Sequence, residues 1–153
     1  WGFNLGTILK ATDKIQFKLQ GVFGKGIENY IADVTPDIGL ATQPGNNPQP
    51  FQGVALPAFG FFSFAEIKWH PKLESSVGYS MLKIDNSNLQ AATAFHQGQY
   101  GLLNFRYYPV KNVLIGAEYQ YGRRDNSDDG FHSNGNKIQL MFEFNFSERI
   151  RLP

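Results

Sequence analysis

Hydrophobic and polar residues alternate along most of this chain, most clearly in the stretch from residue 113 to residue 122. The apolar or aromatic positions of this stretch are Val113, Ile115, Ala117, Tyr119 and Tyr121. The positions between them carry a carboxylate (Glu118), an amide (Gln120) and two glycines. Because successive side chains of a strand point to opposite faces, this strand separates an oily medium from a polar one. It does so over about ten residues, and a tilted strand needs about 9–11 residues to cross a bilayer.

The same alternation recurs along the chain and predicts seven strands in total. We expect them at roughly 2–10, 14–27, 58–69, 73–84, 98–108, 113–124 and 138–146. The segment 28–53 is predicted to be a long loop without a regular ladder, because Pro36, Pro44, Pro48 and Pro50 lie in it. Its composition fits a plug folded into a barrel and an external cap equally well.

The predicted connections alternate between short and long. Short turns are expected near Thr12, Pro71 and Lys111, and longer loops within 28–53, 85–96 and 125–136. Short turns on one side and long loops on the other are typical of outer-membrane barrels, whereas a soluble meander has no reason to sort its loops by side. We therefore expect the short turns to face the periplasm and the long loops to face the outside.

The composition favours the same interpretation. Aromatic residues make up 15% of the 153 residues, and 16 glycines are scattered through the predicted strands. Mean hydropathy is nevertheless negative, and no run of 18 apolar residues occurs, which excludes a transmembrane helix. The chain contains no cysteine, so it has neither disulfides nor thiolate metal sites. A net charge of +1 gives no case for binding nucleic acid.

Charged residues keep to one face of the predicted strands. The outward face carries no Asp, Glu, Lys or Arg within a strand interior, which matters because a basic residue there costs about 2–4 kcal/mol at the bilayer midplane. Aromatic residues gather near strand ends, as in an interfacial girdle. The predicted lipid-facing girdle residues are Trp69, Tyr79, Tyr107, Tyr119, Tyr121, Phe144 and Phe146.

Basic residues on the inward face are the strongest functional candidates. Arg124 shares the parity of Glu118, while Arg106 and Lys18 project inward from other strands. Basic groups that line a water-filled channel attract anions, but they can equally pair with carboxylates across the wall and keep the lumen hydrated. Both roles are open at this stage. The predicted pore-lining residues are Lys18, Glu66, Lys68, Arg106, Glu118, Arg123 and Arg124.

Catalytic and metal-binding alternatives are weaker. His70, His96 and His132 have no second ligand at metal-binding spacing, so no metal or cofactor is expected. A hydrolase built on His132 and Ser133 would need a serine on a strand flanked by a base, and no predicted strand presents one. The carboxylates at 125, 128 and 129 suit calcium, although a solvated loop explains them more simply.

Several runs resemble the C-terminal half of the DcaP-like trimeric outer-membrane porins. The runs are 95–100 (FHQGQY), 107–113 (YYPVKNV), 116–118 (GAE), 122–126 (GRRDN) and the loop 85–88 (DNSN). The resemblance implies a large barrel of 16 strands, a homotrimer, and passive uptake of small, preferably anionic, dicarboxylate-like solutes. It also implies a terminal aromatic residue for assembly, the place that Phe146 occupies, with residues 147–153 following as a tail of unclear origin.

The sequence thus predicts an all-β, transmembrane, antiparallel up-and-down β-barrel, of which residues 1–146 supply about seven C-terminal strands. We expect the N-terminal part of a longer protein to be missing. The predicted function is a passive channel in a bacterial outer membrane, with membrane lipid and small anions as partners. Two alternatives remain open: a non-conducting outer-membrane barrel for adhesion, binding or structural support, and a soluble lipocalin-like carrier.

Overall fold

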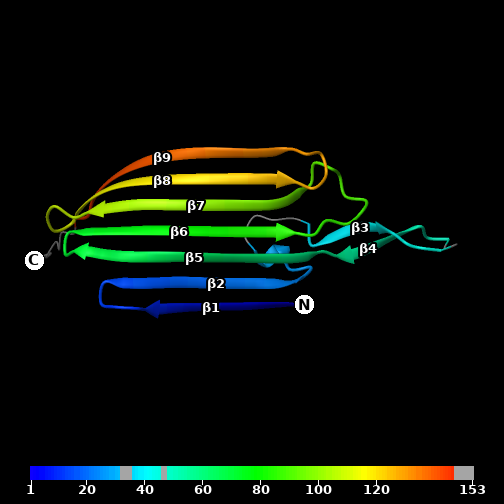
Figure 1. Ribbon diagram of the computed structural model, residues 1–153, viewed down its shortest axis with the longest axis horizontal. Coiled ribbons are helices and arrows are strands. Elements are labelled where there is room, and N and C mark those ends of the chain that lie inside the picture. The colour runs from blue at the N-terminus through cyan, green and yellow to red at the C-terminus, as the bar shows by residue number, and fades with distance from the viewer. Residues whose placement is uncertain (32–35, 46–47, 147–153) are drawn as a thin grey trace, which may run out of the picture.

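The computed structural model describes residues 1–31, 36–45 and 48–146. Its main body is one antiparallel sheet of seven strands, and each strand pairs with the next one of this sheet along the chain (Figure 1). The strands are β1 (Gly2–Lys10), β2 (Ile15–Lys25), β5 (Pro57–His70), β6 (Leu73–Ile84), β7 (Phe95–Tyr107), β8 (Val113–Asn126) and β9 (His132–Phe144). The predicted up-and-down all-β fold is confirmed. No helix within the described ranges is long and apolar enough to span a membrane.

The prediction of an irregular loop over 28–53 is wrong in part. This segment contains a short 3-10 helix, η1 (Glu28–Tyr30), and a hairpin of β3 (Ile38–Thr42) and β4 (Phe51–Ala55). The prolines do not prevent the hairpin because they lie before β3 or between its two strands, where no ladder N–H is needed. The hairpin extends beyond the end of the main sheet (Figure 1).

The prediction of a long loop over 125–136 is also wrong. β8 continues to Asn126 and β9 begins at His132, so the connection is only 127–131. The polar residues that indicated a loop form ladder pairs instead, for example Asp125 with His132 and Arg123 with Asn134. Here polarity marks a strand end surrounded by water, and the two other connections at this end, 26–56 and 85–94, are the long ones.

One face of the sheet carries a band of apolar side chains, which we call the apolar face. A single ladder row shows it: Leu9, Phe17, Ala65, Val77, Leu103, Tyr119 and Ile138 are paired in turn across all seven strands. Many of these side chains are exposed, including Leu103 at 41% and Ile138 at 77%. A continuous band of exposed apolar residues marks a surface that contacts a membrane or another protein.

The apolar band runs obliquely to the ladder rows. On the side of the long loops, the last apolar residue of the band is Phe23 on β2, Met81 on β6, Tyr121 on β8 and Ile138 on β9. From β2 to β9, each of these residues lies closer to the short turns than the one before it. The step is roughly one residue per strand, which at a rise of about 3.4 Å and a strand spacing of about 4.8 Å corresponds to a tilt of roughly 35–40°. Strands of closed membrane barrels are tilted by about 35–45°.

The buried core is small and lies on the opposite face, which we call the polar face, at the end with the long loops. It consists of Ile27, Leu56, Ala58 and Ile84, with Val22, Ile31, Val54 and Phe95 packed against it. The segment after β2 thus folds back over the polar face. Gly24 makes this possible, since a Cβ there would lie 2.3 Å from the carbonyl oxygen of Trp1 and 3.0 Å from Cδ1 of Ile27.

Candidate functional site

A continuous row of polar side chains crosses the polar face. Its members are Lys10, Gln16, Glu66, Ser76, Asn104, Glu118 and Gln139, one from each strand. They form hydrogen bonds along the row: Gln16 Nε2 donates to Glu66 Oε2 at 3.3 Å, and Asn104 Nδ2 donates to Glu118 Oε2 at 3.3 Å. A row of charged and amide groups on one face of a sheet indicates that this face contacts water.

Two of the predicted basic residues are paired with carboxylates. Lys18 Nζ lies 2.7 Å from Glu66 Oε1, and Arg106 Nη2 lies 3.4 Å from Glu74 Oε2. The charges of both pairs therefore largely cancel at a distance. For Lys18 and Arg106 the geometry favours the role of wall-pairing residues over that of free anion-attracting groups.

Arg123 and Arg124 lie on opposite faces. Arg124 is paired with Gly98 and Ser133 on the polar face, whereas Arg123 is paired with Gln99 and Asn134 on the apolar face, beyond the end of the band. Arg123 thus does not share the face of Arg124, although the sequence interpretation placed both along the pore. The reason is the strict alternation of an extended strand.

The two arginines also differ in their partners. Arg123 binds the carboxylate of Asp125, with Nη2 2.9 Å from Oδ1. Arg124 donates instead to neutral oxygens, Asn126 Oδ1 at 3.2 Å and Thr93 O at 3.5 Å, and its guanidinium lies 5.8 Å from the centroid of the Phe95 ring. Among the described residues Arg124 forms no direct ion pair.

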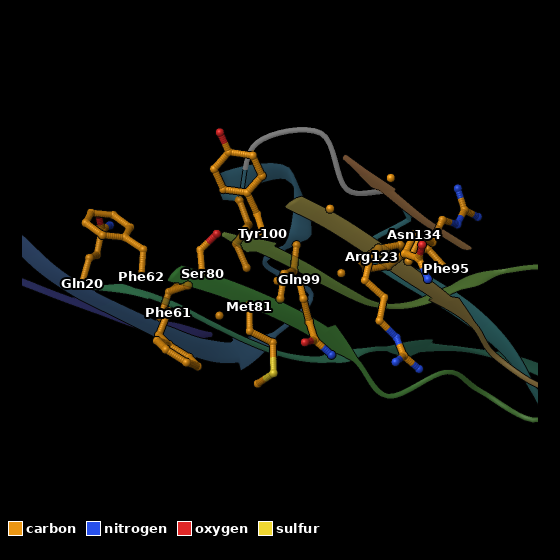
Figure 2. A pocket seen from close by; sticks show the side chains of 18 of the residues that line it. Gln20, Phe61, Phe62, Ser80, Met81, Phe95, Gln99, Tyr100, Arg123 and Asn134 are labelled. Carbon is orange, nitrogen blue, oxygen red and sulfur yellow. The ribbon is translucent and has the colours of Figure 1, made fainter. Parts of the chain in front are cut away.

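A hollow of about 820 Å³ lies where the polar face meets the folded-back segment. Its lining includes Gln20, Tyr30, Phe62, Ser80, Tyr100 and Arg124, and no carboxylate belongs to it among the residues that the structure describes. Figure 2 shows Phe62, Ser80 and Tyr100 on one side of the sheet, with Phe61, Met81 and Gln99 directed to the other side. Gly122 and Gly135 leave free space in the wall of the hollow, because a Cβ at either position would meet nothing within 4 Å.

Sequence reasoning missed Tyr30, Tyr100 and Phe95 as site residues. Phe95 lies on the polar face because the register between β7 and β8 shifts between Phe95 and Gln97, which changes the parity. A one-residue shift of this kind leaves no reliable signal in the sequence. Tyr100 could have been found, since its parity is that of Asn104 and Arg106.

The remaining predicted wall residues lie on the polar face: Lys68 is directly opposite Glu74, and Glu118 is directly opposite Asn104. Most of the predicted girdle residues lie on the apolar face and are exposed, from 39% for Tyr79 to 58% for Phe144. Phe146 follows the end of β9 and stacks on Phe144 with a centroid distance of 6.1 Å. The tail 147–153 lies outside the described residues.

The structure also places the residues of the catalytic and metal-binding alternatives. His132 and Ser133 are neighbours on β9 and point to opposite faces, so they cannot act together. Asp129 accepts hydrogen bonds from Asn126 Nδ2 and from the backbone N–H of Phe131, which lower its pKa. Within the ranges that the structure describes, no group of three or more His, Asp or Glu residues is placed to hold a metal ion.

Comparison with known proteins gives one informative similarity. No protein-family model and no curated protein matches this chain. The crystal structure of the outer membrane channel DcaP of Acinetobacter baumannii is similar, with a TM-score of 0.73 and 24% sequence identity. The similarity covers 95% of this chain but 40% of that channel, so the chain spans less than half of its length. It establishes that the chain has the fold of part of an outer-membrane channel barrel.

Proposed function

We propose that this chain forms part of the wall of an outer-membrane channel through which small hydrophilic solutes diffuse passively. The observation that carries the proposal is the two-faced sheet: an exposed apolar band on one face and a hydrogen-bonded polar row on the other. Membrane lipid would cover the band and water would fill the space beside the polar row. The fold shared with a protein described as an outer membrane channel supports this function.

We further propose that the channel prefers anions, including dicarboxylates. Support comes from the hollow at the mouth, whose lining among the described residues contains Arg124 and no carboxylate. Arg124 lies on the polar face and forms no ion pair within these residues. A fixed positive charge in a confined aqueous passage raises the local concentration of anions. The homotrimer implied by the resemblance stays a prediction.

The decisive experiment is a planar-bilayer recording of the whole protein that contains this chain. We expect stepwise, ohmic conductance and a reversal potential across a KCl gradient that indicates selectivity for chloride. Inserted protein without conductance would favour the alternative of a non-conducting barrel for adhesion or binding. Conductance with cation selectivity would overturn the anion preference but leave the channel in place.

A further inference from the structure

The segment 26–31, which we call the mouth segment, is held against the polar face. Gly26 N donates to Leu56 O at 2.8 Å, and Ile27 is 7% exposed within the small apolar core. Ile27 also reaches the polar face beneath it, since a Cβ at Gly2 would lie 2.8 Å from its Cγ2. Tyr30, in contrast, is 89% exposed and lines the hollow. The mouth segment therefore forms one side of the passage.

Glu28 lies at the centre of this segment and is fully buried. Its exposed fraction is 0%, and neither carboxylate oxygen has a hydrogen-bond partner within the described residues. An ionised carboxylate in such a place is costly, because it loses its hydration without compensation. A neutral carboxyl group is far less penalised, so the docked segment favours the protonated form.

The surroundings of Glu28 increase this preference. The strands packed around the mouth segment contribute apolar side chains, namely Val22 of β2, Ala58 of β5, Ile84 of β6 and Phe95 of β7. Among the described residues, the ionisable group that acts on Glu28 is Asp37, whose Oδ1 accepts a hydrogen bond from the backbone N–H of Asn29 at 2.8 Å. Burial, and secondarily Asp37, raise the pKa of Glu28, while the nearby backbone of residues 27 and 28 partly opposes the rise.

We propose that the protonation state of Glu28 controls whether the mouth segment stays docked, so that the channel of the proposed function is regulated by pH. Below the ordinary pKa of Glu, about 4.3, docking is most favourable. Between that pH and the raised pKa of docked Glu28, the docking equilibrium constant falls by about tenfold per pH unit and then levels off. The pH-dependent docking does not depend on the proposed channel function; only the expected effect on conduction rests on it.

A released mouth segment remains tethered to the end of β2. Lys25, the residue directly before it, keeps its hydrogen bond from N to Trp1 O at 2.9 Å. The loose segment would therefore move within the passage and carry the ring of Tyr30 across it. We expect this motion to appear as brief interruptions of the single-channel current, more frequent at high pH than at low pH.

The test compares the wild-type whole protein with its Glu28→Gln variant, in which an uncharged side chain of the same shape imitates the protonated carboxyl group. Wild-type current should be steady at pH 4 and interrupted at pH 8, whereas Glu28→Gln should be steady at both. Glu143→Gln removes a carboxylate from the polar face at the far end of β9 and should keep the wild-type pH dependence. Equal pH dependence in Glu28→Gln and wild type would overturn the proposal.

A second measurement works without conduction. Backbone hydrogen exchange of residues 27–31, normalised to the hairpin β3–β4 at each pH, should show protection at pH 4 that is lost progressively as the pH is raised to 8 in the wild type. Glu28→Gln should stay protected, and Ile27→Ser should lose protection at both pH values. If the protein does not conduct but shows this exchange pattern, the proposed channel function is refuted and the pH-dependent docking stands. If the protein conducts but lacks this exchange pattern, the pH-dependent docking is refuted and the channel function stands.

Discussion

At the scale of single residues, Arg123 and Arg124 form a natural pair for testing anion preference. We expect Arg124→Gln to lower the ratio of anion to cation permeability, and more at low salt than at high salt, because the field of an exposed charge is screened over about 8–10 Å near physiological ionic strength. Arg123→Gln removes the same charge one residue away on the other face, where Asp125 pairs with it, and should change selectivity little. Reversal potentials across a salt gradient measure both effects. Equal losses in the two variants would contradict the assignment of faces.

Gly78 provides a second test at this scale. A Cβ at Gly78 would lie 2.0 Å from Cδ1 of Phe64, whose ring covers this glycine and contacts Phe62 at a centroid distance of 5.7 Å. Gly78→Ala must displace the ring and should lower the free energy of unfolding by about 1–3 kcal/mol. Gly122→Ala, with nothing within 4 Å of the new Cβ, should be tolerated. Urea unfolding of the whole protein in lipid compares the two variants, and equal stabilities would show that Phe64 moves freely.

The sequence predicted residue positions better than residue partners. Alternation alone placed Glu66, Arg106 and Arg124 on the face where the structure has them, because parity survives small errors in strand boundaries. It could not show that Arg106 pairs with Glu74 while Arg124 has neutral partners, since those pairings depend on the register between strands. It also gave no sign that Glu28 is buried, because burial arises from a loop that folds back onto the sheet.

At the scale of elements, β9 tests which face contacts lipid. Phe142 is 72% exposed and opposite Ile115 on the apolar face, so Phe142→Arg should cost about 2–4 kcal/mol and reduce insertion. Gln139→Arg places the same side chain on the polar face, opposite Glu118, and should be tolerated. Folding yields in lipid, measured by the gel shift between folded and heat-denatured protein, give the comparison. Equal yields would mean that the faces are reversed.

Element boundaries were predicted well where alternation was strict and poorly where composition was used in its place. β1 and β6 begin and end at the predicted residues, since their alternation stops at turns. The sequence pattern does not predict the β3–β4 hairpin, because the proline content of 28–53 disfavours strands although the prolines only flank β3 and β4. It does not predict the start of β9, because residues 132–136 are polar although they pair with β8.

At the scale of the whole molecule, the orientation in the membrane can be tested by cysteine labelling. The chain has no native cysteine, so Lys111→Cys and Asp128→Cys each introduce a single thiol, at opposite ends of β8. An impermeant maleimide added to intact cells should label the whole protein at position 128 and not at position 111, because the end with the long loops is predicted to face outside. Labelling at position 111 alone would show that the orientation in the membrane is the reverse of the predicted one.

Within the part of the chain that the structure describes, the main sheet ends in two strands, β1 and β9, that each have a neighbour on one side only. Both are long, regular and exposed along their whole length, and an unpaired edge of this kind is a template for further strands. Without other strands to close the barrel, copies of these 153 residues would add to one another edge to edge during expression. The product would be inclusion bodies with the cross-β spacing of about 4.7–4.8 Å, so biophysical work on this region requires the closed barrel.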